Sequence, residues 1–152
     1  MDVDTVAVDG EWIRHAPHRS SLLGRASEAT DGRWQHGEVV RALYLADEPA
    51  TAIAEWYRLL AERGLPPGRA IPHDHHVWQL DLQLADLSTP DRLARARLFR
   101  AGFAGILAPS AARPRGLVSC IFDRGAWPPA GCRALRAIEI HEVPPPPTGM
   151  TT

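Results

Sequence analysis

The sequence contains no lysine, so all 17 of its basic residues are arginine. Its 18 acidic residues leave a formal net charge of −1 at pH 7. A chain without a basic excess lacks the positive field that binding to duplex nucleic acid or to an anionic membrane surface usually requires. We therefore expect neither direct nucleic-acid binding nor membrane binding. The guanidinium fork binds phosphate and carboxylate groups in a bidentate manner, so the arginines offer many candidates for binding a phosphorylated ligand.

Cysteine is also scarce, with only Cys120 and Cys132 in the chain. They form no Cys-x-x-Cys pair and have no histidine pair nearby at metal-ligand spacing, so the pattern indicates neither a disulfide framework nor a zinc site. One tract, His73-Asp74-His75-His76, resembles a metal-binding sequence, and a strand would place His73 and His75 on one side. No distant third ligand stands out, so we favour a polar loop that leads into a strand.

No apolar run approaches the length of a membrane span, and no apolar segment of a signal peptide follows the acidic N-terminus. We therefore expect a cytoplasmic protein. A length of 152 residues with 45% hydrophobic and 23% charged residues is typical of one globular domain. We expect that domain at residues 11–143, after an extension at 1–10 and before a proline-rich, disordered tail at 144–152.

Apolar periodicity predicts six strands and two helices. The first helix begins at Pro49, with Asp47 or Glu48 as its cap, and runs to about Arg63 before Gly64, whereas the second runs from Ser88 to about Arg100. A turn at Asp9-Gly10 precedes the first strand, and a long surface loop follows it. The strands are expected at Glu11–His15, Val39–Ala46, His75–Leu84, Phe103–Ala108, Gly116–Phe122 and Arg133–Val143. Strands with two interspersed helices indicate an α+β fold with a mostly antiparallel sheet.

Three polar residues, Arg33, Tyr44 and Glu55, recur at two equal intervals of eleven residues on three different elements. Glu55 stands within or beside the apolar face of the first helix, where an acid needs a reason. It is either a structural acid paired with an arginine such as Arg33 or a catalytic carboxylate in a cleft. Arg33 beside Trp34 fits a simple cation–π pair, and Tyr44 fits a core strand residue. For each residue alone, the structural explanation is favoured.

The ordered set of short motifs, however, resembles the RES domain family, which takes its name from an Arg, a Glu and a Ser. The likeness extends from about Glu11 to Phe122. The first-strand arginine of the family corresponds to Arg14 in Trp12-x-Arg14. The other matching residues are Gly32-Arg33-Trp34, Gly37, Tyr44-Leu45-Ala46, Ala52 with Glu55, and Pro109-Ser110-Ala111.

The resemblance implies a single domain with a split, mostly antiparallel sheet similar to that of the ADP-ribosyltransferases. It also implies the toxin half of a bacterial type II toxin–antitoxin pair, with NAD+ as substrate, water or inorganic phosphate as acceptor, and no required cofactor. The partner it implies is an Xre-type helix-turn-helix antitoxin that covers the active site. The segment from Pro90 to Ala104 is shorter than the family usually has, which affects the expected antitoxin contact.

For such an enzyme, Glu55 is expected to stabilise the positive charge that develops on ribose when nicotinamide leaves. Arg33 and Arg14 would bind the phosphates, Tyr44 would stack on the nicotinamide ring, and Ser110 would supply a positioning hydrogen bond. A Ser110 nucleophile is disfavoured because Pro-Ser-Ala lacks the Gly-x-Ser-x-Gly elbow. Two alternatives stay open: transfer of ADP-ribose to a macromolecule, and a non-catalytic module that binds a nucleotide or a partner.

Overall fold

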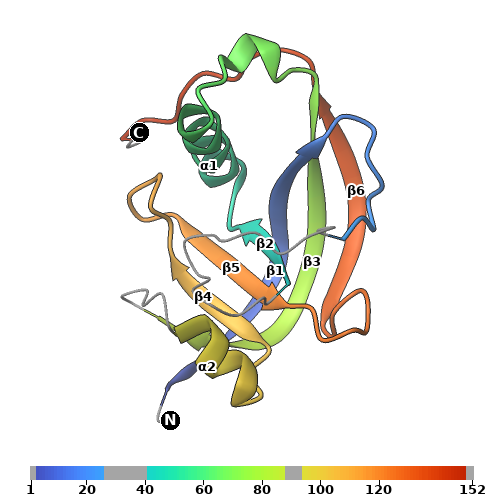
Figure 1. Cartoon of the computed structure of the whole chain (residues 1–152), viewed down its shortest axis with the longest axis vertical. Coiled ribbons are helices and arrows are strands. Elements are labelled where there is room, and N and C mark those ends of the chain that lie inside the picture. The colour runs from blue at the N-terminus through green and yellow to red at the C-terminus, as the bar shows by residue number, and fades with distance from the viewer. Residues whose placement is uncertain (1–2, 26–40, 88–93, 150–152) are drawn as a thin grey trace.

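The computed structural model describes residues 3–25, 41–87 and 94–149 (Figure 1). Within them, every strand pairing is antiparallel except that of β3 with β4, which confirms the predicted α+β fold with a mostly antiparallel sheet. No helix in the described part of the chain is long and apolar enough to cross a membrane. The elements are β1 (Thr5–Pro17), β2 (Ala42–Ala46), α1 (Pro49–Glu62), the 3-10 helix η1 (Pro67–Arg69), β3 (His73–Asp86), α2 (Ala94–Arg100), β4 (Gly105–Pro109), β5 (Leu117–Phe122) and β6 (Cys132–Ile140).

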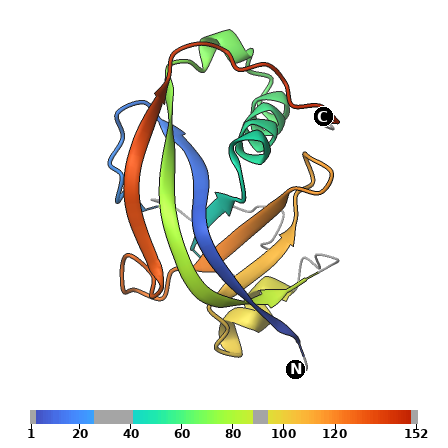
Figure 2. The same cartoon turned by 180° about the vertical axis from the view of Figure 1, so that it is seen from behind.

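The sheet is split into two three-stranded halves. Long strands β1, β3 and β6 lie side by side in one half, whereas β2, β5 and β4 form the other half at a steep angle to the first (Figures 1 and 2). Two short contacts join the halves: Ile13 of β1 pairs with Ala46 of β2, and the end of β3 runs parallel to β4. A split of this kind leaves room for polar side chains where the halves diverge.

The main core lies between the two halves, and five strands contribute to it. Along each strand the core residues alternate with residues that face the other way, as the two-residue period of a strand requires. The alternation predicted for β3 is therefore confirmed on its core side. The buried members are Val8 and Trp12 of β1, Leu43 and Leu45 of β2, Trp78, Leu80 and Leu84 of β3, Leu107 of β4 and Ile121 of β5.

Helix α1 matches the prediction closely, since it begins at Pro49 and ends at Glu62. Gly64 follows with a φ of 63°, a conformation that glycine adopts without strain and that suits a helix end. The capping prediction is wrong in one detail, because Glu48 occupies the N-cap without a side-chain capping bond. Its carboxylate pairs with Arg113 instead.

The first strand is longer than predicted, because β1 already begins at Thr5. Gly10 has a φ of 83° inside the strand, so the predicted turn at this position is wrong. A single glycine with positive φ bends a strand without ending its pairing, and Gly10 still pairs with Leu80. The proposed boundaries at residues 10 and 144 stay predictions, although β1 crosses the first and the hydroxyl of Tyr57 donates to the carbonyl of Pro144 just past the second.

Several predictions are tested only in part. The first residues of the predicted strand at 39–46 and of the predicted second helix lie outside the described residues. The described remainders, β2 and α2, agree with both predictions. The predicted pair of strands around a short connection is confirmed, since β4 and β5 pair in antiparallel register from Gly105–Ile121 to Pro109–Leu117.

Candidate active site

The structure brings Glu55 and Ser110 together, although 55 positions separate them in the sequence. Glu55 projects from α1, and Ser110 follows β4 directly. The hydroxyl of Ser110 donates a hydrogen bond of 2.6 Å to Glu55 Oε1. The Ser110 hydroxyl oxygen in turn accepts bonds of 3.1 Å from the backbone N–H groups of Ala112 and Arg113. Because two donors occupy the oxygen, its proton points to the carboxylate, and one carboxylate oxygen is held in a defined position.

The turn at residues 110–116, called the Ser110 turn below, docks on the first half of α1. Arg113 Nη1 donates to Thr51 Oγ1 at 3.0 Å and pairs with Glu48. Glu48, Thr51 and Glu55 are spaced by three and four residues, so all three lie on one face of the helix. A Cβ at Gly116 would lie 2.7 Å from Thr51 Oγ1, which is too close for any other residue without rearrangement. The carbonyl of Gly116 accepts a bond of 2.8 Å from the backbone N–H of Ser110, which connects this close approach to the position of Ser110.

Glu55 itself is half-buried, which agrees with its predicted place beside the apolar face of α1. The buried residues of that face include Ala52, Trp56 and Leu60, as predicted. No described arginine pairs with Glu55. Arg33, the proposed structural partner, lies outside the described residues, as do Trp34 and the rest of that motif.

Tyr44 does not behave as an ordinary core residue. Leu43 and Leu45 on either side of it enter the main core, so Tyr44 points to the opposite face of β2, beside its partner Cys120 in β5. Its side chain is 42% exposed. An exposed aromatic ring on a strand is suited to stack on a flat ligand.

Arg14 lies on β1 and is engaged mainly with the protein. Its Nη2 donates to the carbonyls of Leu22 and Gly24, each at 3.1 Å, and lies 3.4 Å from Nδ1 of His76. Its guanidinium stands 5.3 Å from the ring centre of Trp78, and its Nε is buried without a hydrogen-bond partner. Burial lowers the pKa of this arginine. Among the described residues, Arg14 makes no hydrogen bond to Glu55 or Ser110, so the structure does not bring it into their contact.

Residues 18–25, which follow β1, belong to the predicted surface loop, and hydrogen bonds hold them against the rest of the domain. Besides the two carbonyls held by Arg14, the carbonyl of Leu23 accepts a bond of 2.8 Å from the indole of Trp127. Arg25 donates to the carbonyl of Gly125 and pairs with Asp123 at 3.3 Å. These contacts tie the segment to the connection between β5 and β6.

The favoured interpretation of the histidine tract as a polar loop is wrong, because β3 begins at His73 and all four residues are buried. Their strand register explains the burial. His73 and His75 face α1, where His73 stacks on Trp56 with a centroid distance of 4.6 Å, whereas Asp74 and His76 face the opposite way. The continuous alternation of this tract with Val77 and Trp78 was the sequence signal for a strand that starts earlier.

Burial controls the charge of these histidines. It lowers the pKa of His75 to about 4, with a further contribution from the neighbouring His73 and His76. The pKa of His15, which pairs with His75 across β1 and β3, is also lowered to about 4, by burial first and by nearby histidines and arginines second. Both rings are therefore neutral at pH 7.

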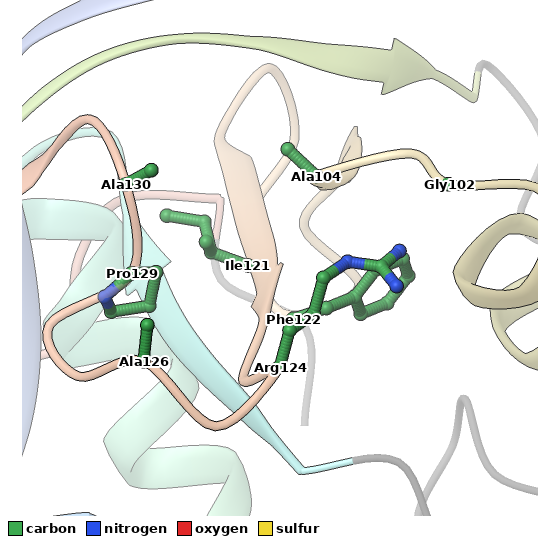
Figure 3. A pocket seen from close by; sticks show the side chains of 8 residues that line it. All are labelled: Gly102, Ala104, Ile121, Phe122, Arg124, Ala126, Pro129 and Ala130. Atoms are coloured by element: carbon green, nitrogen blue, oxygen red, sulfur yellow. The ribbon is translucent and has the colours of Figure 1, made fainter.

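One pocket in the described part of the chain, of about 340 Å³, lies between β5, the connection that follows β5 and the residues just before β4 (Figure 3). Its lining is mostly apolar. Arg124 stands at this pocket beside Phe122, and its guanidinium donates to the carbonyls of Phe99 and Phe103. None of the predicted site residues that the structure describes lines it, so the sequence and the pocket point to different places. The hydrogen-bonded carboxylate at Glu55 is the stronger candidate for chemistry.

Comparison with known proteins identifies the family and the fold. The family model described as RES domain matches residues 7–141. No curated protein matches the sequence. Among solved structures, the fold is similar to that of the toxin MbcT in the crystal structure of the M. tuberculosis MbcT–MbcA toxin–antitoxin complex, with a TM-score of 0.70 and 19% sequence identity over 90% of this chain and 87% of the other. Because the family model covers most of its length, the chain belongs to the RES domain family.

Proposed function

We propose that this chain is the toxin of a toxin–antitoxin pair and that it cleaves the bond between nicotinamide and ribose in NAD+. The observation that carries the proposal is the contact between Ser110 and Glu55, the serine and the glutamate that match the family motif. Membership of the RES domain family supports it, as does the likeness of the fold to a toxin that was crystallised with its antitoxin.

The chemistry of this reaction suits a fixed carboxylate. When nicotinamide leaves as a neutral group, positive charge develops on the ribose. A carboxylate about 4 Å from that charge, at an effective dielectric constant near 20, stabilises it by roughly 4 kcal/mol. That energy corresponds to about a thousandfold in rate. Glu55 supplies the charge in this proposal, and Ser110 holds the carboxylate so that it does not reorient during the reaction.

The remaining roles belong to residues that bind the substrate. Tyr44 offers an exposed ring for stacking on nicotinamide. Arg33 and Arg14 are proposed to bind the pyrophosphate or an attacking phosphate. NAD+ is the substrate in this scheme and no further cofactor is needed.

The proposed partner is an antitoxin protein of the Xre-type helix-turn-helix class that covers the Glu55 site. Support comes from the solved structure of similar fold, which is a toxin–antitoxin complex. An encoded neighbour with a helix-turn-helix motif that co-purifies with this chain and suppresses its turnover would support the pairing. A neighbour that binds without affecting turnover would contradict the covering of the site.

The test is to incubate the purified chain with NAD+ labelled in its adenosine half, with and without inorganic phosphate, and to measure released nicotinamide. Label in free ADP-ribose identifies water as acceptor, and label in a phosphorylated ADP-ribose identifies phosphate. Label on protein or nucleic acid would instead support the alternative, an ADP-ribosyltransferase. Absence of nicotinamide release by a chain whose circular dichroism shows it folded would leave a non-catalytic binding module as the better account.

A further inference from the structure

We infer that a divalent transition-metal ion, with Zn²⁺ as the first candidate, binds where the segment after β1 meets the ends of β3 and β6, with His18, Asp74 and Glu139 as ligands. One ligand atom from each of these residues lies within 4.8 Å of the other two. Imidazole nitrogen and carboxylate oxygen are both common zinc ligands. This inference does not rest on the proposed reaction with NAD+.

The three ligands come from three separate segments and surround one point. His18 Nδ1 lies 3.1 Å from Asp74 Oδ1, and Asp74 pairs directly with Glu139 across β3 and β6. A fourth candidate, His141, has its Nε2 at 3.0 Å from Glu139 Oε2 and its ring 5.6 Å from that of His18. The assembled group has three ligands, and a movement of His141 toward it would complete a tetrahedral set of two imidazoles and two carboxylates.

The charges at this place favour a cation. Asp74 is 2% exposed, and no described arginine side chain pairs with it. Its carboxylate accepts bonds from His18 and from the backbone N–H of Arg19, and Glu139 adds a second negative charge. The Arg19 side chain, at 3.6 Å from Glu139, is 78% exposed and free to move toward solvent. A buried carboxylate beside a second one is stabilised by a divalent cation more than by one exposed arginine.

A buried histidine beside Asp74, His76, also suits a metal site. His76 is fully buried, and Arg14, which has only donors, lies against its Nδ1, so this neutral ring carries its proton on Nε2. That Nε2 has no hydrogen-bond partner and stands 4.0 Å from Asp74 Oδ2. A buried donor close to a ligating carboxylate is usual at metal sites. Here it also links the site to Arg14.

The ligand atoms must move closer together when the metal ion binds. Ligands at 2.0–2.1 Å from a tetrahedral zinc ion stand about 3.4 Å from one another. The necessary movement falls on Glu139 and His141, whose side chains are 44% and 60% exposed, while Asp74 stays in place. A bound ion would fasten the segment after β1 to the long half of the sheet, together with the carbonyls of that segment that hold Arg14.

The experiment measures Zn²⁺ binding by equilibrium dialysis, on the full chain without a histidine tag and after treatment with a chelator. We expect one ion per chain with a dissociation constant of about 10 μM or lower. His18→Ala and Glu139→Gln should each weaken binding at least tenfold, since even the loss of a residue that only hydrogen-bonds a ligand costs about that much. The control Glu62→Gln, an exposed carboxylate on α1, should bind as the unaltered chain does.

Cobalt gives a second readout, since Co²⁺ in a tetrahedral site of nitrogen and oxygen ligands has visible bands that depend on those ligands. The spectrum should be altered in both site variants and kept in Glu62→Gln. Circular dichroism of each variant without metal shows whether it folds, and both altered side chains are accessible to solvent. Absence of stoichiometric binding by the unaltered chain, or equal binding by all variants, overturns the site.

Discussion

The hydroxyl of Ser110 is partly buried and the rings of the histidines at the start of β3 are buried, and the two regions differ in their hydrogen bonds. The Ser110 oxygen has three partners, one of them the carboxylate of Glu55. By contrast, both ring nitrogens of His73 and Nε2 of His75 and His76 are buried without a partner. Satisfied polar groups can hold a charge in place, whereas unsatisfied ones are tolerated only while they stay neutral.

The two regions are therefore suited to different roles, one in catalysis and one in the stability of the fold. The Ser110 turn is suited to fix a charged catalytic group, since its contacts to α1 are polar and complete. The buried histidines are suited to make the stability of the fold depend on pH, since protonation places a charge in an apolar environment. Changes at the first region should therefore affect turnover, and changes at the second should affect unfolding.

Replacing Glu55 by Gln should have the largest effect, because it removes the charge and keeps the shape. We expect NAD+ turnover to fall by a hundredfold or more, up to about a thousandfold, with substrate binding largely kept. Nicotinamide release measures kcat, and a binding titration with NAD+ measures affinity. Glu62→Gln on the same helix is the matched control. Equal turnover in Glu55→Gln and the unaltered chain would assign Glu55 a structural role.

Acid should also destabilise the fold through His15 of β1, which pairs with His75 of the second region. The pKa of His15 is about 4 in the folded chain and near its ordinary 6.5 when unfolded. The unfolded chain therefore binds more protons between these values, so stability is full above about pH 6.5 and is lost as pH falls toward about 4. The loss for this one group reaches about 3 kcal/mol.

Urea denaturation across this range, in the presence of a chelator, measures the loss. His15→Gln, which does not titrate, should flatten the dependence, whereas His141→Gln at an exposed position should keep it. A profile of His15→Gln that follows the unaltered chain at every pH would show that the His15 ring contributes nothing to acid sensitivity.

Ser110→Ala should have the next effect, since it removes the hydrogen bond that holds the Glu55 carboxylate. A hydrogen bond to a charged group contributes about 1.5–3 kcal/mol, so kcat/KM should fall about ten- to hundredfold. Ser119→Ala is the control, because the buried Ser119 hydroxyl donates to the carbonyl of Leu45. Should both variants lose the same activity, the defect would lie in packing and not in the carboxylate.

Arg113→Gln should have the smallest effect. Its partner Glu48 is half exposed, and surface ion pairs contribute about 1 kcal/mol or less. We expect the melting temperature to fall by roughly 2–4 °C at most, with turnover reduced by less than the Ser110→Ala change. A larger loss of activity than for Ser110→Ala would mean that the arginine contacts the substrate as well as α1.

Much of the local structure follows from the sequence. Pro49 and Gly64 mark the ends of α1 because one suits the first turn of a helix and the other adopts positive φ without strain. The alternating apolar residues of β3 indicate a strand in the same way. The prediction of a turn at Gly10 fails because the positive φ that makes glycine a turn residue also occurs inside a bent strand.

The sequence by itself determined the α+β class, the bounds of α1 and the set of motif residues that matches the RES domain family. Only the tertiary structure decided that Ser110 meets Glu55 on one face of α1, and that Asp74 lies buried between His18 and Glu139. The physical reason is that periodicity reports which face of an element is apolar. It does not report which distant segment covers that face, since this depends on how the two halves of the sheet pack.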